Sequence, residues 1–214
     1  MVDDTVLTRR GFLAGCATAT GSLVVIGPAV VQPAAAVEGT AADNCQYGFL
    51  CDLSKCVGCE NCVAACRDAN HLSDNTPNRR HVDVFLNSRC SNVYVSTACN
   101  HCADPNCLRV CPAGAISKGT AGIVSVDKER CIGCKYCYQA CPYGVPHYNE
   151  VAMDKCDCCL SAGVAPGDTP YCVRACKFDA LKYGPIVQLK EEHPEAVPVG
   201  EACDPSCVLV GERR

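Results

Sequence analysis

Short apolar runs separated by polar turns predict the elements of this chain. Residues 81–86 and 92–96 read as strands, because apolar and β-branched side chains alternate with polar ones over five or six positions. Residues 115–126 read as a hairpin, with two short β-rich runs on either side of a glycine-bounded turn. Residues 62–70 predict a short helix, and residues 137–141 the beginning of another. Short strands and helices mixed in this way predict an α+β fold.

Composition changes this picture, because few large apolar side chains are available for a core. The 214 residues include 23 cysteines, 4 phenylalanines and no tryptophan. The hydrophobic fraction of 49% falls to about 38% when cysteine is left out, which is low for a globular protein. The chain therefore needs crosslinks in addition to apolar packing. A net charge of -4 argues against a nucleic-acid-binding protein.

The first 36 residues have the order of regions found in an export signal. Arg9 and Arg10 precede an apolar, small-residue-rich stretch over 12–31, and Ala34-x-Ala36 suits a signal peptidase. The paired arginines followed by Phe-Leu resemble a twin-arginine signal. We therefore expect export by the twin-arginine route to the periplasm or the outer face of the cytoplasmic membrane. That route moves folded, cofactor-loaded proteins, so it favours metal inserted in the reducing cytoplasm over a disulfide protein.

Two other interpretations of the N-terminus are weaker. A short membrane anchor over the same stretch is interrupted by Gly21, Gly27 and Pro28. A lipoprotein box at 13–16 lacks the apolar region that should precede Cys16. Cleavage of the signal stays open. No later segment is long and apolar enough to cross a bilayer, so we expect the mature chain to be soluble or peripheral.

Sixteen of the remaining cysteines fall into four groups of four with short, regular spacing. The first and third groups have the spacing C-x2-C-x2-C-x3-C, which is that of bacterial ferredoxins. The second and fourth groups differ from it by loop insertions. The four groups are Cys56, Cys59, Cys62 and Cys66; Cys99, Cys102, Cys107 and Cys111; Cys131, Cys134, Cys137 and Cys141; and Cys156, Cys159, Cys172 and Cys176.

This spacing points to [4Fe–4S] clusters with cysteine thiolates as iron ligands. Two residues between cysteines let one loop wrap three irons of a cubane, and the fourth cysteine ligates the other cluster in two-cluster ferredoxins. Four groups therefore supply ligands for four [4Fe–4S] clusters, built as two ferredoxin-like pairs. Zinc ribbons do not use such tight runs, and a disulfide framework would crowd three thiols too closely for regular pairing. No cysteine pair is followed by the histidine that a c-type haem needs.

With these motifs the chain resembles a known family. It is similar, from Leu50 to Gly184, to the four-cluster iron–sulfur beta subunit of the dimethyl sulfoxide reductase/polysulfide reductase superfamily of molybdopterin oxidoreductases. The resemblance rests on the four groups in order, on Cys99-Asn-His-Cys102 with Pro105 before Cys107, and on Lys155-Cys156. It implies an electron-transfer subunit of an oxidoreductase complex that is not catalytic on its own.

The resemblance also implies which cysteines share a cluster, because in that family the groups pair first with fourth and second with third. All three leading cysteines of the third group are present, so four cubanes are implied and not the three-iron cluster of relatives with a tryptophan there. The implied ligand sets are Cys56, Cys59, Cys62 and Cys176; Cys156, Cys159, Cys172 and Cys66; Cys99, Cys102, Cys107 and Cys141; and Cys131, Cys134, Cys137 and Cys111.

The implied fold class is α+β, with two ferredoxin-like dicluster units, the second inserted into the first, and short β-hairpins and helices around four [4Fe–4S] clusters. The expected divisions after the signal are a linker over 37–49, a first unit over 50–98 and 143–184, an inserted unit over 99–142, and an extended tail rich in proline and glutamate over 185–214.

Six cysteines stay outside the groups once Cys16 is assigned to the signal. Disulfides formed after export, with Cys203 and Cys207 a candidate pair, and buried free thiols are both open. His101 is expected near a cluster, but not as a ligand, because four cysteines are already available. The other four of these cysteines are Cys45, Cys51, Cys90 and Cys158.

Basic residues near the groups are expected to offset the negative charge of the clusters, about -8 in total for four cubanes with thiolate ligands. Lys177 is also a departure from the family, whose pattern has proline after the final cysteine. The lysines concerned are Lys55, Lys118, Lys135, Lys155 and Lys177.

The sequence therefore predicts an exported relay of electrons between a quinol-oxidising or cytochrome-type membrane partner and a molybdopterin-containing catalytic subunit. One alternative keeps the clusters but places the chain in a periplasmic hydrogenase or formate dehydrogenase. Relatives of that kind often carry a C-terminal membrane helix, which is not seen in this sequence. A second alternative is a secreted, disulfide-rich binding protein. No nucleic-acid partner is expected.

Overall fold

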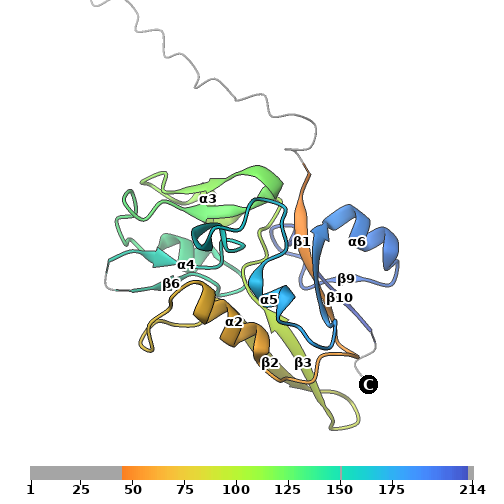
Figure 1. Cartoon of the computed structure of the whole chain (residues 1–214). Helices are drawn as coiled ribbons and strands as arrows, with labels where there is room; N and C mark the ends of the chain where they lie inside the picture. The colour runs from red at the N-terminus through yellow and green to blue at the C-terminus, as the bar shows by residue number, and fades with distance from the viewer. Residues whose placement is uncertain (1–44, 150, 212–214) are drawn as a thin grey trace, which may run out of the picture. The chain divides into compact units, whose positions relative to one another are not determined.

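The computed structural model describes residues 45–149 and 151–211, and strand β1 lies inside its main sheet. β1 (Tyr47–Asp52) pairs antiparallel with β8 (Leu181–Pro185) on one side and parallel with β10 (Cys207–Val210) on the other. β9 (Val197–Pro198) pairs antiparallel with β10, which gives the strand order β8-β1-β10-β9. Helix α6 (Ile186–Glu192) contacts β1 and β8 (Figure 1). Segments from the two ends of the described residues therefore share one sheet.

Two helices that are distant in the sequence pack against each other near this sheet. They are α2 (Asn61–Ala69) and α5 (Tyr171–Arg174), and α5 also contacts β8. The antiparallel hairpin of β2 (His81–Leu86) and β3 (Asn92–Thr97) follows α2 along the chain. Buried side chains of β3 join the same core as β1. The helix pair and the hairpin thereby bring the first and last cysteine groups into one part of the fold.

A second set of elements comes from the middle of the sequence. Helix α3 (Asn106–Arg109) packs against α4 (Tyr136–Ala140), and the antiparallel pair of β4 (Ile116–Lys118) and β5 (Val124–Val126) lies between them in sequence. No helix within residues 45–149 and 151–211 has the length and apolar character needed to cross a bilayer. The remaining elements are the antiparallel pair β6 (His147–Tyr148) and β7 (Met153–Asp154) and the 3-10 turns at Thr120–Gly122 and Leu160–Ala162.

Cysteine side chains fill much of the space that large apolar residues occupy in other cores. In the core around β1, Phe49, Val95 and Leu181 pack with five buried cysteines, and in the core around β4 and β5, Ile116, Val124 and Met153 pack with Cys137. Apolar side chains therefore share both cores with cysteines. The five cysteines of the first core are Cys51, Cys62, Cys158, Cys172 and Cys207.

The elements predicted from the residue pattern are confirmed with small shifts of their ends. The predicted strands 81–86 and 92–96 are β2 and β3, and the predicted helix 62–70 is α2. The hairpin at 115–126 is the β4–β5 pair, and the helix expected at 137–141 is α4. Short helices and short strands mixed along the chain confirm an α+β architecture. These elements are encoded by local patterns, which explains why the sequence was sufficient to find them.

The expected divisions at the two ends are wrong where the structure describes them. Residues 185–211 are not an extended tail, because they form α6, β9 and β10, and every residue of β10 is buried. The expected linker 37–49 overlaps β1, which begins at Tyr47. A short apolar strand is recognisable only when its partner is known, and the partner of β10 is β1, far away in the sequence. The expected signal over 1–36 and the rest of the linker, 37–44, lie outside the described residues.

Gly48 allows β1 to approach the segment before β10, so replacing it with alanine is expected to destabilise the fold. A Cβ at position 48 would overlap the carbonyl oxygen of Ser206 and would lie 2.8 Å from Cδ1 of Ile186. We expect Gly48→Ala to cost about 1–3 kcal/mol of stability, as overpacked sites do, measured by anaerobic denaturation. Gly119→Ala is the matched control, because its nearest atom would be 4.0 Å away. Equal stability of the two variants would contradict this packing.

Candidate metal centres

The four C-x2-C turns share one backbone feature. The residue just before the second cysteine of each turn has a positive φ, which is 72° at Gly58, 41° at His101, 65° at Gly133 and 54° at Cys158. Left-handed conformations are costly for residues other than glycine and persist only where the surroundings hold them. His101 and Cys158 therefore adopt the turn that glycine adopts in the other two groups. The common turn supports a common task for the four groups.

The third cysteine of every group stands at the same place on a helix. Cys62, Cys107, Cys137 and Cys172 are each the second residue of α2, α3, α4 and α5, respectively. Before α2 and α4 the chain turns through a second left-handed residue, Glu60 or Lys135. The fourth cysteine of each group follows four residues later, one helical turn onward. Each group thus consists of a curled loop and the first turn of a helix.

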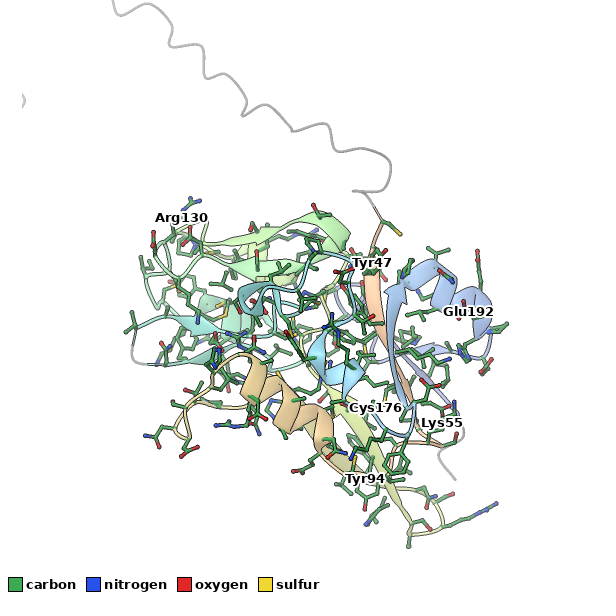
Figure 2. The ribbon with its side chains drawn as sticks, in the orientation of Figure 1. Tyr47, Lys55, Tyr94, Arg130, Cys176 and Glu192 are labelled. Carbon is green, nitrogen blue, oxygen red and sulfur yellow. The ribbon has the colours of Figure 1, made fainter. Side chains whose placement is uncertain are left out.

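One cavity is lined by three cysteines of the first group and the last cysteine of the fourth group. Its sulfur-bearing walls are Cys56, Cys59, Cys62 and Cys176, together with Cys51 from β1. Cys176 follows α5, and the ring of Tyr94 lies against Gly58 in the loop of the first group (both side chains are labelled, Cys176 and Tyr94, in Figure 2). Four thiols from two distant segments therefore converge on one space.

A second cavity has the same construction in the middle of the sequence. It is lined by Cys131, Cys134 and Cys137 of the third group and by Cys111, the last cysteine of the second. Hydrogen-bond donors surround these sulfurs. The Met153 N–H lies 3.4 Å from Cys131 Sγ, the Ala115 N–H lies 3.3 Å from Cys111 Sγ, and the Tyr148 hydroxyl lies 3.0 Å from Cys137 Sγ. Donors of this kind stabilise thiolates that bind metal.

In the other two predicted sets, the sulfurs lie close enough to affect one another's pKa. Burial, together with the ionised sulfurs of Cys156, Cys172 and Cys159, raises the pKa of the Cys66 thiol to about 12. The second set shows the same effect. Burial raises the pKa of Cys102 to about 12, and the neighbouring sulfurs that contribute include Cys99, Cys107 and Cys141. It costs free energy to ionise several buried thiols that lie close together, because their negative charges repel one another. A bound cation offsets this repulsion.

His101 lies beside cysteine sulfurs and makes hydrogen bonds there, and its protonation can be assigned from the contacts. Its Nδ1 accepts the N–H of Val124 at 3.0 Å, so Nε2 carries the proton. Nε2 lies 3.2 Å from Cys158 Sγ, and His101, Cys156 and Cys158 together form one buried group. The imidazole is therefore a donor to sulfur, and it lies close to both Cys158 and Cys156 of the fourth group.

Among the lysines predicted to offset cluster charge, Lys155 has the strongest case. It is 4% exposed, and its Nζ donates to the carbonyl oxygens of Val124 and Cys156. Burial opposes its charge, but the ionised sulfurs of Cys99 and Cys156 hold its pKa above the ordinary value. The other four lysines are more exposed. Lys55 pairs with Asp52 and Asp179, and Lys118 donates to the carbonyl oxygens of Cys102 and Ala103. Lys135 lies over the Tyr148 ring, and Lys177 faces solvent.

The cysteines outside the groups are free thiols wherever the structure describes them, so the candidate Cys203–Cys207 disulfide is not formed. Cys207 is buried in β10, whereas Cys203 lies close enough to Cys102 to raise its pKa. Cys51 hydrogen-bonds Cys56 and thereby lowers the pKa of Cys56 to about 6. Cys90 is exposed in the turn of the β2–β3 hairpin, and Cys45 is half-buried.

Three polar residues near the sulfurs were not predicted from the sequence. Tyr148 contacts Cys137, Ser96 lies 3.3 Å from Cys62 Sγ, and Arg80 is fully buried beside Ser96. Arg79-Arg80 before a strand reads as an ordinary charged surface pair. Only the burial of both side chains reveals them, and no local pattern signals that burial.

The donor set fits iron–sulfur clusters. The converging groups are thiols, with the His101 imidazole beside Cys156 and Cys158, and the surrounding donors are amides and hydroxyls near sulfur. The described residues include no mixed histidine–carboxylate group of the kind that hard cations prefer. The cysteines would ligate the irons, and the donors around them would stabilise the thiolates.

Comparison with known proteins leads to the same chemistry. A family model described as a 4Fe-4S dicluster domain matches residues 90–186. The B subunit of anaerobic dimethyl sulfoxide reductase from Escherichia coli (strain K12) is 42% identical over 172 residues, covering 72% of this sequence and 80% of the relative. The subunit of the same name from Haemophilus influenzae is 41% identical over 161 residues, covering 69% and 78%. The thiosulfate reductase electron transfer subunit PhsB of Salmonella typhi is 40% identical over 146 residues, covering 65% and 76%.

These relatives match this protein over most of their own length, and the family model matches a region that contains the second, third and fourth cysteine groups. Fold, thiol chemistry and similarity thus agree with the resemblance drawn from the sequence. This protein belongs to the ferredoxin-like [4Fe–4S] electron-transfer subunits of the dimethyl sulfoxide reductase/polysulfide reductase superfamily, and it serves an oxidoreductase complex as its electron carrier and not as its enzyme.

Proposed function

We propose that the sixteen grouped cysteines hold four [4Fe–4S] clusters and that the protein relays electrons through them. The observation that carries this proposal is the cavity in which Cys176 of the fourth group lies with three cysteines of the first group, more than a hundred positions earlier in the sequence. The sites are numbered here by their ligands: site 1, Cys56, Cys59, Cys62 and Cys176; site 2, Cys156, Cys159, Cys172 and Cys66; site 3, Cys99, Cys102, Cys107 and Cys141; site 4, Cys131, Cys134, Cys137 and Cys111.

The proposed arrangement is nested, with sites 3 and 4 in a unit inserted into the unit of sites 1 and 2. Two packing contacts support it: α2 of the first group packs on α5 of the fourth, and α3 of the second packs on α4 of the third. Each half also has its own antiparallel strand pair, β1–β8 in one and β4–β5 in the other. The outer unit, proposed from the sequence as 50–98 and 143–184, would also include β1 from Tyr47 and β10.

The residues of this protein set the environment in which electrons move. When bound, a [4Fe–4S] cluster supplies one-electron redox chemistry. Backbone N–H groups such as those of Met153 and Ala115 donate to the sulfurs of site 4, which favours extra negative charge there. Lys155 brings a buried positive charge between Cys99 of site 3 and Cys156 of site 2. Electron transfer through the protein would therefore be governed by fixed charges and hydrogen bonds.

The proposed partners are a molybdopterin-containing catalytic subunit and a membrane quinol-oxidising subunit or cytochrome. The names of the relatives support a reductase over a hydrogenase or formate dehydrogenase, since all three are named as subunits of reductases. Substrate chemistry would belong to the catalytic subunit. Arg9-Arg10 and the apolar stretch after them support export by the twin-arginine route to the periplasm or the outer face of the cytoplasmic membrane.

Iron and acid-labile sulfide analysis of anaerobically purified protein tests the proposed clusters. We expect about sixteen irons and about sixteen sulfides per polypeptide, because each of four cubanes contains four of both. A protein with paired thiols and no iron would overturn the proposed function. About eight irons would leave one dicluster unit and contradict the four-site arrangement.

A further inference from the structure

Arg80 carries a buried positive charge that no carboxylate balances. The side chain is 1% exposed, and its Nε and Nη2 have no hydrogen-bond partner. Within the described residues no Asp or Glu lies within ion-pair distance of it. An isolated charge in a dry interior costs several kcal/mol unless another charge compensates it. Some negative group other than a carboxylate must therefore stabilise Arg80.

Its sequence neighbour Arg79 shows the usual solution. Arg79 is also buried, but its Nε and Nη2 bind the two carboxylate oxygens of Asp154 at 2.7 and 2.8 Å. Its Nη1 lies 3.4 Å from Asp157. The charge of Arg79 is therefore neutralised by carboxylates, whereas the charge of Arg80 remains available to other groups.

Sulfurs of two of the proposed sites lie around Arg80, as does the free thiol of Cys207. The ionised sulfurs that act on its charge are Cys172, Cys156 and Cys66 of site 2 and Cys62 of site 1. One face of the guanidinium is covered by the ring of Phe49, 4.7 Å from the ring centroid, which excludes water from that side. Arg80 is thus a cation that lies near sulfurs of both ligand sets.

A series of hydrogen bonds connects Arg80 to one ligand of site 1. Arg80 Nη1 donates to Ser96 Oγ at 3.0 Å, and Ser96 Oγ lies 3.3 Å from Cys62 Sγ. Because a guanidinium has donors only, Ser96 accepts that bond and is free to donate its own proton. A ligating thiolate has only acceptor sites, so the Ser96 hydroxyl points its proton at Cys62.

We propose that Arg80 is a positioning residue for electron transfer, a counter-charge shared by sites 1 and 2, and that Ser96 extends its influence as a hydrogen bond to Cys62. This inference rests on the proposed ligand sets. Reduction adds one electron to a site and makes it more negative, so a fixed cation favours the reduced form and raises the midpoint potential. Arg80 would raise the midpoint potentials of both sites, so the difference in potential between the two sites would change little.

Anaerobic redox titration followed by electron paramagnetic resonance tests this role in the full-length protein. For Arg80→Met, two of four titration steps should move to lower potential. At fixed potential the ratio of reduced to oxidised site should fall by about tenfold, which is ~59 mV for one electron. Arg80→Lys keeps the charge and should move both steps less. Ser96→Ala should lower one step only.

The controls come from the same hairpin. Arg89→Met removes an exposed charge in the turn, and Thr97→Ala removes a hydroxyl that donates to Asp83 and not to sulfur. Both should leave all four steps in place. Unmoved steps in Arg80→Met with full iron would overturn the inference alone, whereas absence of iron from the unaltered protein would overturn the proposed function.

If Arg80→Met does not retain iron, the other two variants decide. The shared counter-charge would be supported if one titration step moved to lower potential in Ser96→Ala and all four steps were still present in Arg80→Lys. An unmoved step in Ser96→Ala, or loss of iron from Arg80→Lys as well, would overturn it, because the side chain would then matter for shape and not for charge.

Discussion

Replacing Cys176 with alanine is expected to alter the same redox signal as replacing Cys59, and not the signal altered by replacing Cys159. In the sequence, Cys176 belongs to the group of Cys159, but in the structure it lines the cavity of Cys56, Cys59 and Cys62. Alanine has no ligand atom, so the affected site should lose between about one and four irons, as a cubane becomes a three-iron cluster or is lost. Iron analysis and electron paramagnetic resonance of the three variants make the comparison.

Cys90→Ala is the control for these variants. Cys90 is an exposed free thiol in the turn of the β2–β3 hairpin, so its loss should change neither iron content nor any signal. If Cys176→Ala and Cys159→Ala affected one signal, the cysteine groups would act as separate local sites. The crossed arrangement of sites 1 and 2 would then be wrong.

Replacing Arg79 with methionine is expected to produce the largest loss of stability among changes outside the cysteines. Arg79 joins Asp154 on β7, Asn70 at the end of α2 and Asp157 in the loop of the fourth group. Methionine would leave Asp154 buried with only Lys128 as partner. Removing one member of a buried ion pair costs about 3–5 kcal/mol, which anaerobic denaturation followed by circular dichroism would measure.

The same ion pair predicts how stability changes with acid. Burial opposes ionisation of Asp154, but hydrogen bonds from Arg79 and Lys128 outweigh it, and the pKa of Asp154 lies below its ordinary value. A carboxyl whose pKa is lower in the folded state adds stability above its unfolded pKa, and this stability is lost as pH falls through the folded pKa. The unaltered protein should therefore lose stability on acidification, and Arg79→Met should lose less.

Arg109→Met is the control for this ion pair. Arg109 pairs with Asp104 at the surface, where both side chains are more than half exposed. Exposed pairs contribute about 0–1 kcal/mol, so the change should be small. Similar losses of stability in the two arginine variants would contradict the role assigned to the buried pair.

The candidate sites could be predicted from the sequence to the level of residue type and grouping. The tight spacing of Cys56, Cys59 and Cys62 is a local property, because a loop and one helical turn are enough to aim these thiols at one space. The β2–β3 hairpin and helix α2 were predicted for the same reason, from patterns within a few residues. Part of the environment of the sulfurs was predicted, namely His101 and Lys155. Ser96, Tyr148 and Arg80 were not predicted, because they come from elements outside the cysteine groups.

Residues 185–211 show what could not be predicted from local sequence. Their proline and glutamate content is typical of an extended tail, yet Cys207–Val210 is a fully buried strand. Its burial depends on β1, which supplies a parallel partner from the other end of the described residues. Local composition gives no information on such a partner.

The sequence by itself determined the grouping of the cysteines, their number and their spacing, from which iron–sulfur chemistry and the family resemblance followed. Only the tertiary structure buried Arg80 without a carboxylate and paired Arg79 with Asp154, and it placed Cys176 in one cavity with Cys56, a grouping that the resemblance had implied. The physical reason is the range of the interactions. Ligand spacing acts within one loop, whereas burial, charge compensation and strand pairing depend on segments that meet only when the protein folds.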